Sequence, residues 1–133
     1  MTEIQRLRPA GLIVSPAFSH VAVVPPGATT IYVGGQNAVD AHGALIGDGD
    51  VATQSVRALQ NVTTALAAAG ATLADVVQWT VLFVDGVDLG AGYGAIAGDL
   101  AAEEPGLVTA ARVAGLGVPG ALVEISAVAA VIR

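Results

Sequence analysis

A chain of 133 residues in which 54% are hydrophobic and only 12% charged is long enough for one domain with a buried core, and too apolar to remain disordered. The absence of cysteine excludes disulfides, thiol nucleophiles and cysteine-based zinc or iron–sulfur sites, and the absence of lysine excludes Schiff-base catalysis. A formal net charge of −6 without a basic cluster argues against nucleic acid as the main partner.

The apolar excess indicates more hydrophobic surface than one chain can bury, which favours an interface between subunits. A membrane span is the other explanation, but no apolar run reaches the roughly 18–20 residues that a spanning helix requires. The first residues, MTEIQRLRP, lack the apolar segment of a signal peptide. We therefore expect residues 1–133 to form one cytoplasmic domain that does not enter a membrane.

Three short strands are expected in the first third of the chain. Apolar and β-branched residues place them at Leu12–Val14, His20–Val24 and Thr30–Gly34. The Pro25-Pro26-Gly27 sequence separates the last two and predicts a turn, so these two strands are expected to form a hairpin.

The clearest helix of the sequence follows a loop over residues 37–46. Asp48 or Asp50 can cap its first turn, because a carboxylate there accepts hydrogen bonds from free backbone N–H groups. One buried stripe recurs at three-to-four-residue spacing, formed by Val51, Ser55, Leu59, Val62, Leu66 and Ala69. Gly70 supplies the end of this helix, and Thr72 to Asp75 predicts a capping-box turn.

The segment Val76–Val84 (VVQWTVLFV) is the best strand, with Val77, Trp79, Val81 and Phe83 on one face. A second helix is expected over Leu89–Glu103, with a stripe formed by Tyr93, Ile96, Ala97 and Leu100. Three glycines at four-residue spacing predict that its backbone packs closely against a neighbour; these are Gly90, Gly94 and Gly98.

Two more strands are expected at Leu107–Ala114 and Leu122–Val131, with a turn at Pro119-Gly120. The order β-β-β-α-β-α-β-β predicts an α+β fold, in which both helices cover one face of a mixed sheet.

Two features that suggest a ligand site have simpler interpretations. Gly115–Gly120 matches G-x-G-x-x-G, but a strand follows it rather than a helix, so we interpret it as a turn. His20 and His42 are not accompanied by a cluster of acidic residues, so no metal site is expected.

Arg112 and Glu124 are the only charges in two apolar strands. Arg112 is the only charge between Glu104 and Glu124. A charge in such a strand must be paired, exposed at an edge, or functional. A salt bridge between the two residues across a hairpin is one interpretation. In the other, Arg112 binds a small carboxylate through two parallel hydrogen bonds while Glu124 handles a proton or a water molecule. The sequence leaves both open.

An ordered set of segments resembles the RidA (YjgF) family of reactive-intermediate deaminases, once called the L-PSP endoribonuclease family. The set spans nearly the whole chain and comprises Ile31–Asp40 (IYVGGQNAVD), Gly43–Gly47, Gln54, Ala58–Val62, Ala69–Ala71, Asp75–Val77, Tyr93, Ala111–Val113, Leu116 and Val123–Ile125.

The resemblance implies a chorismate-mutase-like fold and a homotrimer with active sites in clefts between subunits. Members of this family hydrolyse enamines and imines such as 2-aminoacrylate to 2-oxo acids and ammonia, without metal or organic cofactor. The expected protein is therefore a 2-iminobutanoate/2-iminopropanoate deaminase-like hydrolase, whose partners are a small imino or oxo acid and two further copies of itself.

Site residues carry over from the resemblance by position. Arg112 would bind the substrate carboxylate, Glu124 would place or activate water, and the backbone of Gly35 and Ala114 would line the site. Phe18 would line the site where many members carry a tyrosine.

Further departures from the family pattern are Gly90, where the deaminase branch often has asparagine, and Ala110, which replaces a common proline. These departures indicate a divergent branch, in which His20 faces either the cleft or solvent.

Two other functions are compatible with the sequence. A non-catalytic trimer could hold a small acid or a partner enzyme in the same cleft, because Phe18 and Gly90 remove two polar contacts. A ribonuclease, which the older family name suggests, is disfavoured by the acidic charge.

Overall fold

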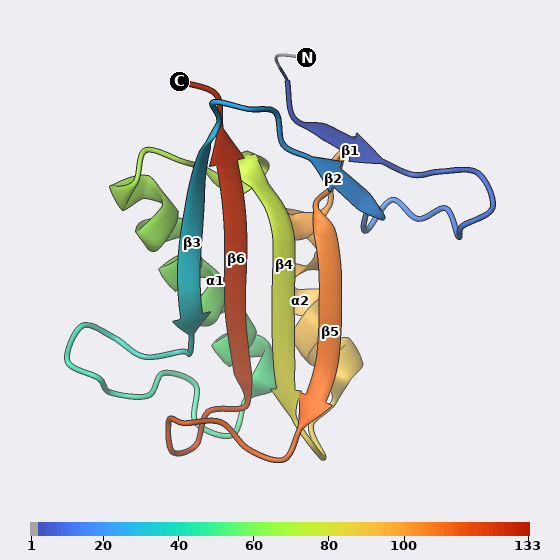
Figure 1. Ribbon diagram of the computed structural model, residues 1–133. Helices are drawn as coiled ribbons and strands as arrows, with labels where there is room; N and C mark the ends of the chain where they lie inside the picture. The colour runs from blue at the N-terminus through green and yellow to red at the C-terminus, as the bar shows by residue number, and fades with distance from the viewer. Residues whose placement is uncertain (1–2) are drawn as a thin grey trace.

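A four-stranded mixed sheet and two helices form the two layers of the computed structural model, which describes residues 3–133 (Figure 1). The strand order is β3-β6-β4-β5, and a separate two-stranded sheet pairs β1 with β2. The elements are β1 (Gln5–Leu7), β2 (Val21–Val23), β3 (Thr29–Gln36), α1 (Val51–Ala68), a 3-10 turn (Leu73–Asp75), β4 (Val76–Val84), α2 (Leu89–Leu100), β5 (Leu107–Val113) and β6 (Val123–Val131).

Strand pairing places β6 at the centre of the sheet. β6 runs antiparallel to both β3 and β4, whereas β4 and β5 are parallel. A parallel pair needs a crossover connection, and α2 supplies it. The expected α+β order of elements is confirmed, with helices on one face of a mixed sheet.

Two expectations for the N-terminal third are wrong. Residues Leu12–Val14 lie in an exposed loop, and the first strand is instead Gln5–Leu7. The expected hairpin between His20–Val24 and Thr30–Gly34 does not form, because β2 pairs with β1 and β3 pairs with β6. Pro25 and Pro26 have no N–H to donate to a ladder, so the chain leaves one sheet at this point and enters the other.

Helix α1 has the predicted cap, stripe and end. The Asp50 carboxylate accepts hydrogen bonds from the Thr53 N–H (3.2 Å) and hydroxyl (2.9 Å). The helix ends at Ala68, and Gly70 adopts the left-handed conformation with φ 74°. Thr72 and Asp75 form the expected capping box directly before β4.

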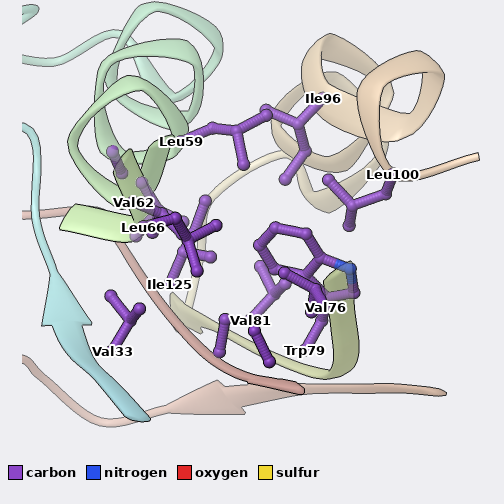
Figure 2. Close-up of a cluster of buried hydrophobic side chains, with 14 of the residues drawn as sticks. Val33, Leu59, Val62, Leu66, Val76, Trp79, Val81, Ile96, Leu100 and Ile125 are labelled. Carbon is purple, nitrogen blue, oxygen red and sulfur yellow. The ribbon is translucent and has the colours of Figure 1, made fainter. Parts of the chain in front are cut away.

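The core lies between the helices and the sheet (Figure 2). Leu59, Val62 and Leu66 of α1 and Ile96 and Leu100 of α2 point toward the strands. Their partners on the sheet include Val33, Val76, Trp79, Val81 and Ile125. The predicted inner face of Val76–Val84 is correct for Trp79, Val81 and Phe83. At the start of the strand the register shifts, and Val76 rather than the predicted Val77 joins the core.

Helix α2 differs from the expectation in its length and its glycines. It ends at Leu100 rather than Glu103. A Cβ added to Gly94 or Gly98 would meet nothing within 4 Å, whereas a Cβ on Gly92 would lie 2.6 Å from Phe83 Cε1. Gly92 precedes Ile96 by four residues and shares its buried face, so Gly92, and not the predicted series, makes the close approach.

In the part of the chain that the structure describes, no helix covers the second face of the sheet (Figure 1). We call it the open face. Tyr32 of β3 points out from it with 79% of its surface exposed. Alternation places Leu82, Glu124, Ser126 and Val128 on the same face. Within residues 3–133, Glu124 is the only strand residue of this face with a formal charge.

Neither helix of the described part of the chain has both the length and the hydropathy needed to cross a lipid bilayer.

Candidate functional site

Arg112 lies near the end of the edge strand β5. It occupies the register position beside Phe83, whose side chain faces the helices. Its Nη1 donates a hydrogen bond to the carbonyl oxygen of Val87, in the loop before α2, at 3.0 Å. This contact holds one side of the exposed guanidinium and leaves other N–H groups for an anion. A guanidinium in this state can bind a carboxylate through two parallel hydrogen bonds.

Glu124 lies at the start of β6, half-buried beside Gly35 of β3. A Cβ on Gly35 would lie 2.6 Å from Cδ and 2.7 Å from Oε2 of Glu124. Gly35 is not among the positive-φ glycines of the chain, so its importance here is steric. The missing side chain of Gly35 provides the space that the Glu124 carboxylate occupies.

Arg112 and Glu124 do not form the salt bridge considered from the sequence. Strand β4 lies between β5 and β6, so the expected hairpin is absent. Arg112 pairs with Phe83 and Glu124 with Leu82, and adjacent residues of a strand point to opposite faces. Two strand spacings, roughly 10 Å, and the sheet itself therefore separate the two side chains.

Gly35 and Ala114 lie at the same end of the sheet as this pair. Ala114 follows β5 directly, two residues after Arg112, and Gly35 adjoins Glu124. Four of the five proposed site residues are thus at one end of the sheet, although Arg112 and Glu124 are on different faces.

Phe18 lies at the other end of the sheet. The N–H of its neighbour Ser19 donates to Gly106 O (3.1 Å), just before β5 begins. Arg112 lies six residues beyond Gly106 along the strand, which corresponds to roughly 20 Å. The Phe18 ring meets the His20 ring edge-on at 5.4 Å, and His20 Nε2 contacts the Ile13 carbonyl oxygen at 2.7 Å. One chain therefore does not bring Phe18 to Arg112.

Sequence reasoning assigned no role to a polar network that supports the Glu124 end of the sheet. Gln54 of α1, fully buried, donates to the carbonyls of Gly47 and Gly120 and accepts from Leu122 N–H. Gln54 could have been recognised from the sequence as a polar residue next to the apolar stripe of α1, because a buried polar side chain needs hydrogen-bond partners. These bonds fix the loop before β6, and hence the start of the strand that carries Glu124.

Asn37 and Asn61 form the second part of this network. Asn37 Nδ2 donates to Val123 O at 3.0 Å, and Asn61 Nδ2 donates to the carbonyls of Asn37 and Val39, each at 2.9 Å. These bonds connect the segment after β3 to α1 and to β6. They also give hydrogen-bond partners to backbone carbonyl groups that would otherwise lack them.

The Asp40 carboxylate organises the loop that follows. The backbone N–H groups of Ala44 and His42 donate to it and hold its pKa below the ordinary value, and the positive charge of Arg57 contributes a smaller part. Within residues 3–133, no group of three or more histidine, aspartate or glutamate side chains is placed to hold a metal ion.

Comparison with known proteins identifies the family. The model of the Endoribonuclease L-PSP family matches residues 12–131, nearly the whole chain. The chain belongs to this family, the YjgF/RidA family. No curated protein gives a significant match.

Solved structures of Rid proteins have the same fold. YyfB of Yersinia pestis, described as a Rid-family protein of unknown function, is 28% identical over 98% of this chain and all of its own, with a TM-score of 0.84. Rv2704 of Mycobacterium tuberculosis, of the YjgF/YER057c/UK114 family, is 28% identical over 97% of this chain and all of its own, with a TM-score of 0.66. The E. coli YjgF product is 28% identical over 80% of this chain and 83% of its own, with a TM-score of 0.66.

Proposed function

We propose that the protein hydrolyses small imines and enamines that carry a carboxylate, releasing a 2-oxo acid and ammonia, in a cleft between copies of the chain. The observation that carries this proposal is the placement of Arg112 and Glu124 on opposite faces at one end of the sheet. One chain cannot present both groups to one small ligand, whereas two adjoining chains can.

The open face supports assembly with further copies. It carries exposed Tyr32 and an almost uncharged surface, and Glu124 is at its end. Apolar surfaces of this kind are usually covered by another protein surface. Three copies would give the trimer that family membership favours.

The chemistry requires little beyond orientation. The imine carbon is already electrophilic, so a bound water can add to it when the two are held together. Arg112 would bind the substrate carboxylate, while the Glu124 carboxylate accepts a proton from the attacking water. The resulting carbinolamine has gained an oxygen. The proton held by Glu124 passes to the former imine nitrogen, and Glu124 then moves the hydroxyl proton of the carbinolamine to that nitrogen. The carbon–nitrogen bond breaks, ammonia leaves, and the carbon–oxygen double bond of the 2-oxo acid forms. An enamine enters the same sequence once protonation of its β-carbon by solvent has given the imine.

The first test is Arg112→Ala, with Arg112→Lys as a control that keeps the charge. Imines can be generated by an amino-acid oxidase, and the rate of 2-oxo acid formation then compared with the uncatalysed rate. We expect Arg112→Ala to reduce kcat/KM roughly 100-fold, because it removes a charge-assisted bidentate contact. Arg112→Lys should recover only part of this loss. A wild type no faster than Arg112→Ala would contradict the proposal.

Phe18 favours a second candidate, a non-catalytic trimer that holds a small acid in the same cleft. Phenylalanine supplies no hydroxyl where many relatives carry one, and its ring packs edge-on against the ring of His20. Thermal stabilisation by 2-oxo acids without imine turnover would favour this function over hydrolysis.

Ribonuclease activity is the least compatible with the charge. A chain with formal net charge −6 has few groups to neutralise phosphates. RNA should stay intact after prolonged incubation with highly purified protein.

A further inference from the structure

A second polar anchor lies in the helix layer, away from Arg112 and Glu124. Two surface grooves, about 430 and 420 Å³ in volume, both include Arg57 of α1 in their walls. The first runs along α1 toward Ala95 of α2, and the second lies between α1 and the loop after β3. Among the described residues, Arg57 is the only cationic one that lines either groove.

The guanidinium of Arg57 is half-buried and oriented. Its Nε donates to Asn61 Oδ1, one helical turn later, at 3.1 Å. Within residues 3–133, its two terminal nitrogens donate to no protein acceptor. A planar fork held at one nitrogen, with its outer N–H groups free, is preorganised to bind a carboxylate.

The other arginines of the chain are engaged differently. Each donates to at least one backbone carbonyl: Arg6 to Ala74 and Val76, Arg8 to Ser15 and Glu103, Arg112 to Val87, and Arg133 to Ala69. Arg57 alone contacts only a neutral side chain. Within residues 3–133, Arg57 forms no hydrogen bond or ion pair with a carbonyl or carboxylate oxygen, although Asp40 is near enough for the two charges to interact. A partly buried guanidinium whose terminal N–H groups are free can bind an anion.

The lining of the grooves restricts the ligand. Asp40 lies in the wall of one groove and adds a negative charge near Arg57, which disfavours a dianion such as phosphate. Apolar side chains complete the walls, among them Val39 and Ala65 on one side and Ile46 and Val56 on the other. We propose that Arg57 anchors a second ligand site, which takes a small monocarboxylate with a short apolar tail.

The site is connected to the Glu124 end of the sheet. Asn61, which holds Arg57, donates to the carbonyls of Asn37 and Val39, and Asn37 donates to Val123 O beside Glu124. Binding at Arg57 therefore acts on a hydrogen-bond chain that ends one residue from Glu124. This connection makes the site a candidate for regulating the proposed reaction.

Titration of ¹⁵N-labelled protein with hexanoate tests the proposal directly. Hexanoate should shift the Arg57 Nε–H signal and the Asn61 and Asn37 side-chain amide signals, and should bind more tightly than neutral hexanamide or inorganic phosphate. Arg57→Gln keeps helix propensity and a donor for Asn61, and should weaken hexanoate binding about tenfold or more. An unchanged melting temperature would verify that this variant is folded.

Arg112→Gln is the matched control and should leave the Arg57 shifts unchanged. Hexanoate binding that is lost in Arg57→Gln and kept in Arg112→Gln supports the site whether or not imines are hydrolysed. The proposal is overturned if Arg57→Gln binds hexanoate as the wild type does, if hexanamide binds equally well, or if phosphate binds more tightly. It is also overturned if Arg112→Gln abolishes the Arg57 shifts.

Discussion

At the scale of single residues, the position of the Glu124 carboxylate depends on a missing side chain. Any Cβ at position 35 would overlap the carboxylate and force it to rotate away. A Cβ on Gly34, directly before it, would meet nothing within 4 Å. A comparison of alanine variants at these two positions therefore distinguishes displacement of Glu124 from the general effect of replacing a glycine in β3.

We expect Gly35→Ala to reduce imine hydrolysis on the order of 10- to 100-fold, because a displaced carboxylate no longer places the attacking water. The melting temperature should change little, since the backbone at Gly35 is not in the left-handed region. Steady-state kinetics beside Gly34→Ala would measure this. Equal activity of the two variants would show that the position of Glu124 does not matter for turnover.

Sequence reasoning identified Arg112 and Glu124 because an isolated charge in an apolar strand demands an explanation. It could not predict their relation, since that depends on which strand lies between β5 and β6. Gln54, Asn37 and Asn61 received no role for a similar reason. Apart from the Arg57–Asn61 contact within α1, their hydrogen-bond partners are backbone groups that only the fold brings close, so the side-chain pattern of the sequence does not reveal them.

At the scale of elements, helix α2 packs on β4 through one glycine. A Cβ on Gly92 would lie 2.6 Å from Phe83 Cε1 and 2.9 Å from Val51 Cγ2. Gly92→Ala should therefore lower the free energy of unfolding by about 1–3 kcal/mol through overpacking. Gly94→Ala, on the open side of the same helix, should raise it by about 0.5–1 kcal/mol. Urea unfolding of both variants checks the pair, and two changes of the same sign would contradict this packing.

The N-cap of α1 predicts a pH dependence. Hydrogen bonds from the backbone N–H and hydroxyl of Thr53 lower the pKa of Asp50 in the folded state below the ordinary value of 3.8. The ionised carboxylate therefore stabilises the fold above the unfolded-state pKa, and this contribution is lost as the pH falls through the folded-state pKa. Asp50→Ala should be less stable than wild type at pH 7, and the difference should shrink below about pH 4.

Thermal unfolding from pH 7 to pH 3 would measure this difference. Asp50→Asn serves as the control, because asparagine still caps a helix but does not titrate. A stability difference for Asp50→Ala that is independent of pH would refute the role of the ionised cap.

Elements defined by local signals could be predicted from the sequence. The capped, periodic α1 and the alternating β4 were found at their observed positions, because caps, turns and faces depend on neighbours in sequence. The strands β1 and β2 could not be paired correctly. Each has only three residues, and the pairing is supported by distant contacts such as those of Arg6 with Ala74 and Val76.

At the scale of the whole molecule, the open face offers a test of the trimer that the family resemblance implies. We expect a solution mass of about three times 13.1 kDa. Tyr32→Glu should shift the mass toward that of the single chain, because it places a charge where another copy would dock, and Tyr32 is too exposed to be needed for folding. Val56→Glu, on the helix layer, should keep the wild-type mass. Light scattering after size-exclusion chromatography would measure all three proteins.

The central position of β6 has a consequence for how the molecule is made. β3 and β4 do not pair with each other, and both wait for a strand that is synthesised some forty residues after β4. Until then the nascent chain has two unpaired strand edges, and one of them belongs to the apolar VVQWTVLFV segment. Unpaired edges of this kind can pair with other chains and lead to aggregation. Such long-range closure makes folding slow. The chain must therefore leave the ribosome as far as Val131 before its sheet can close.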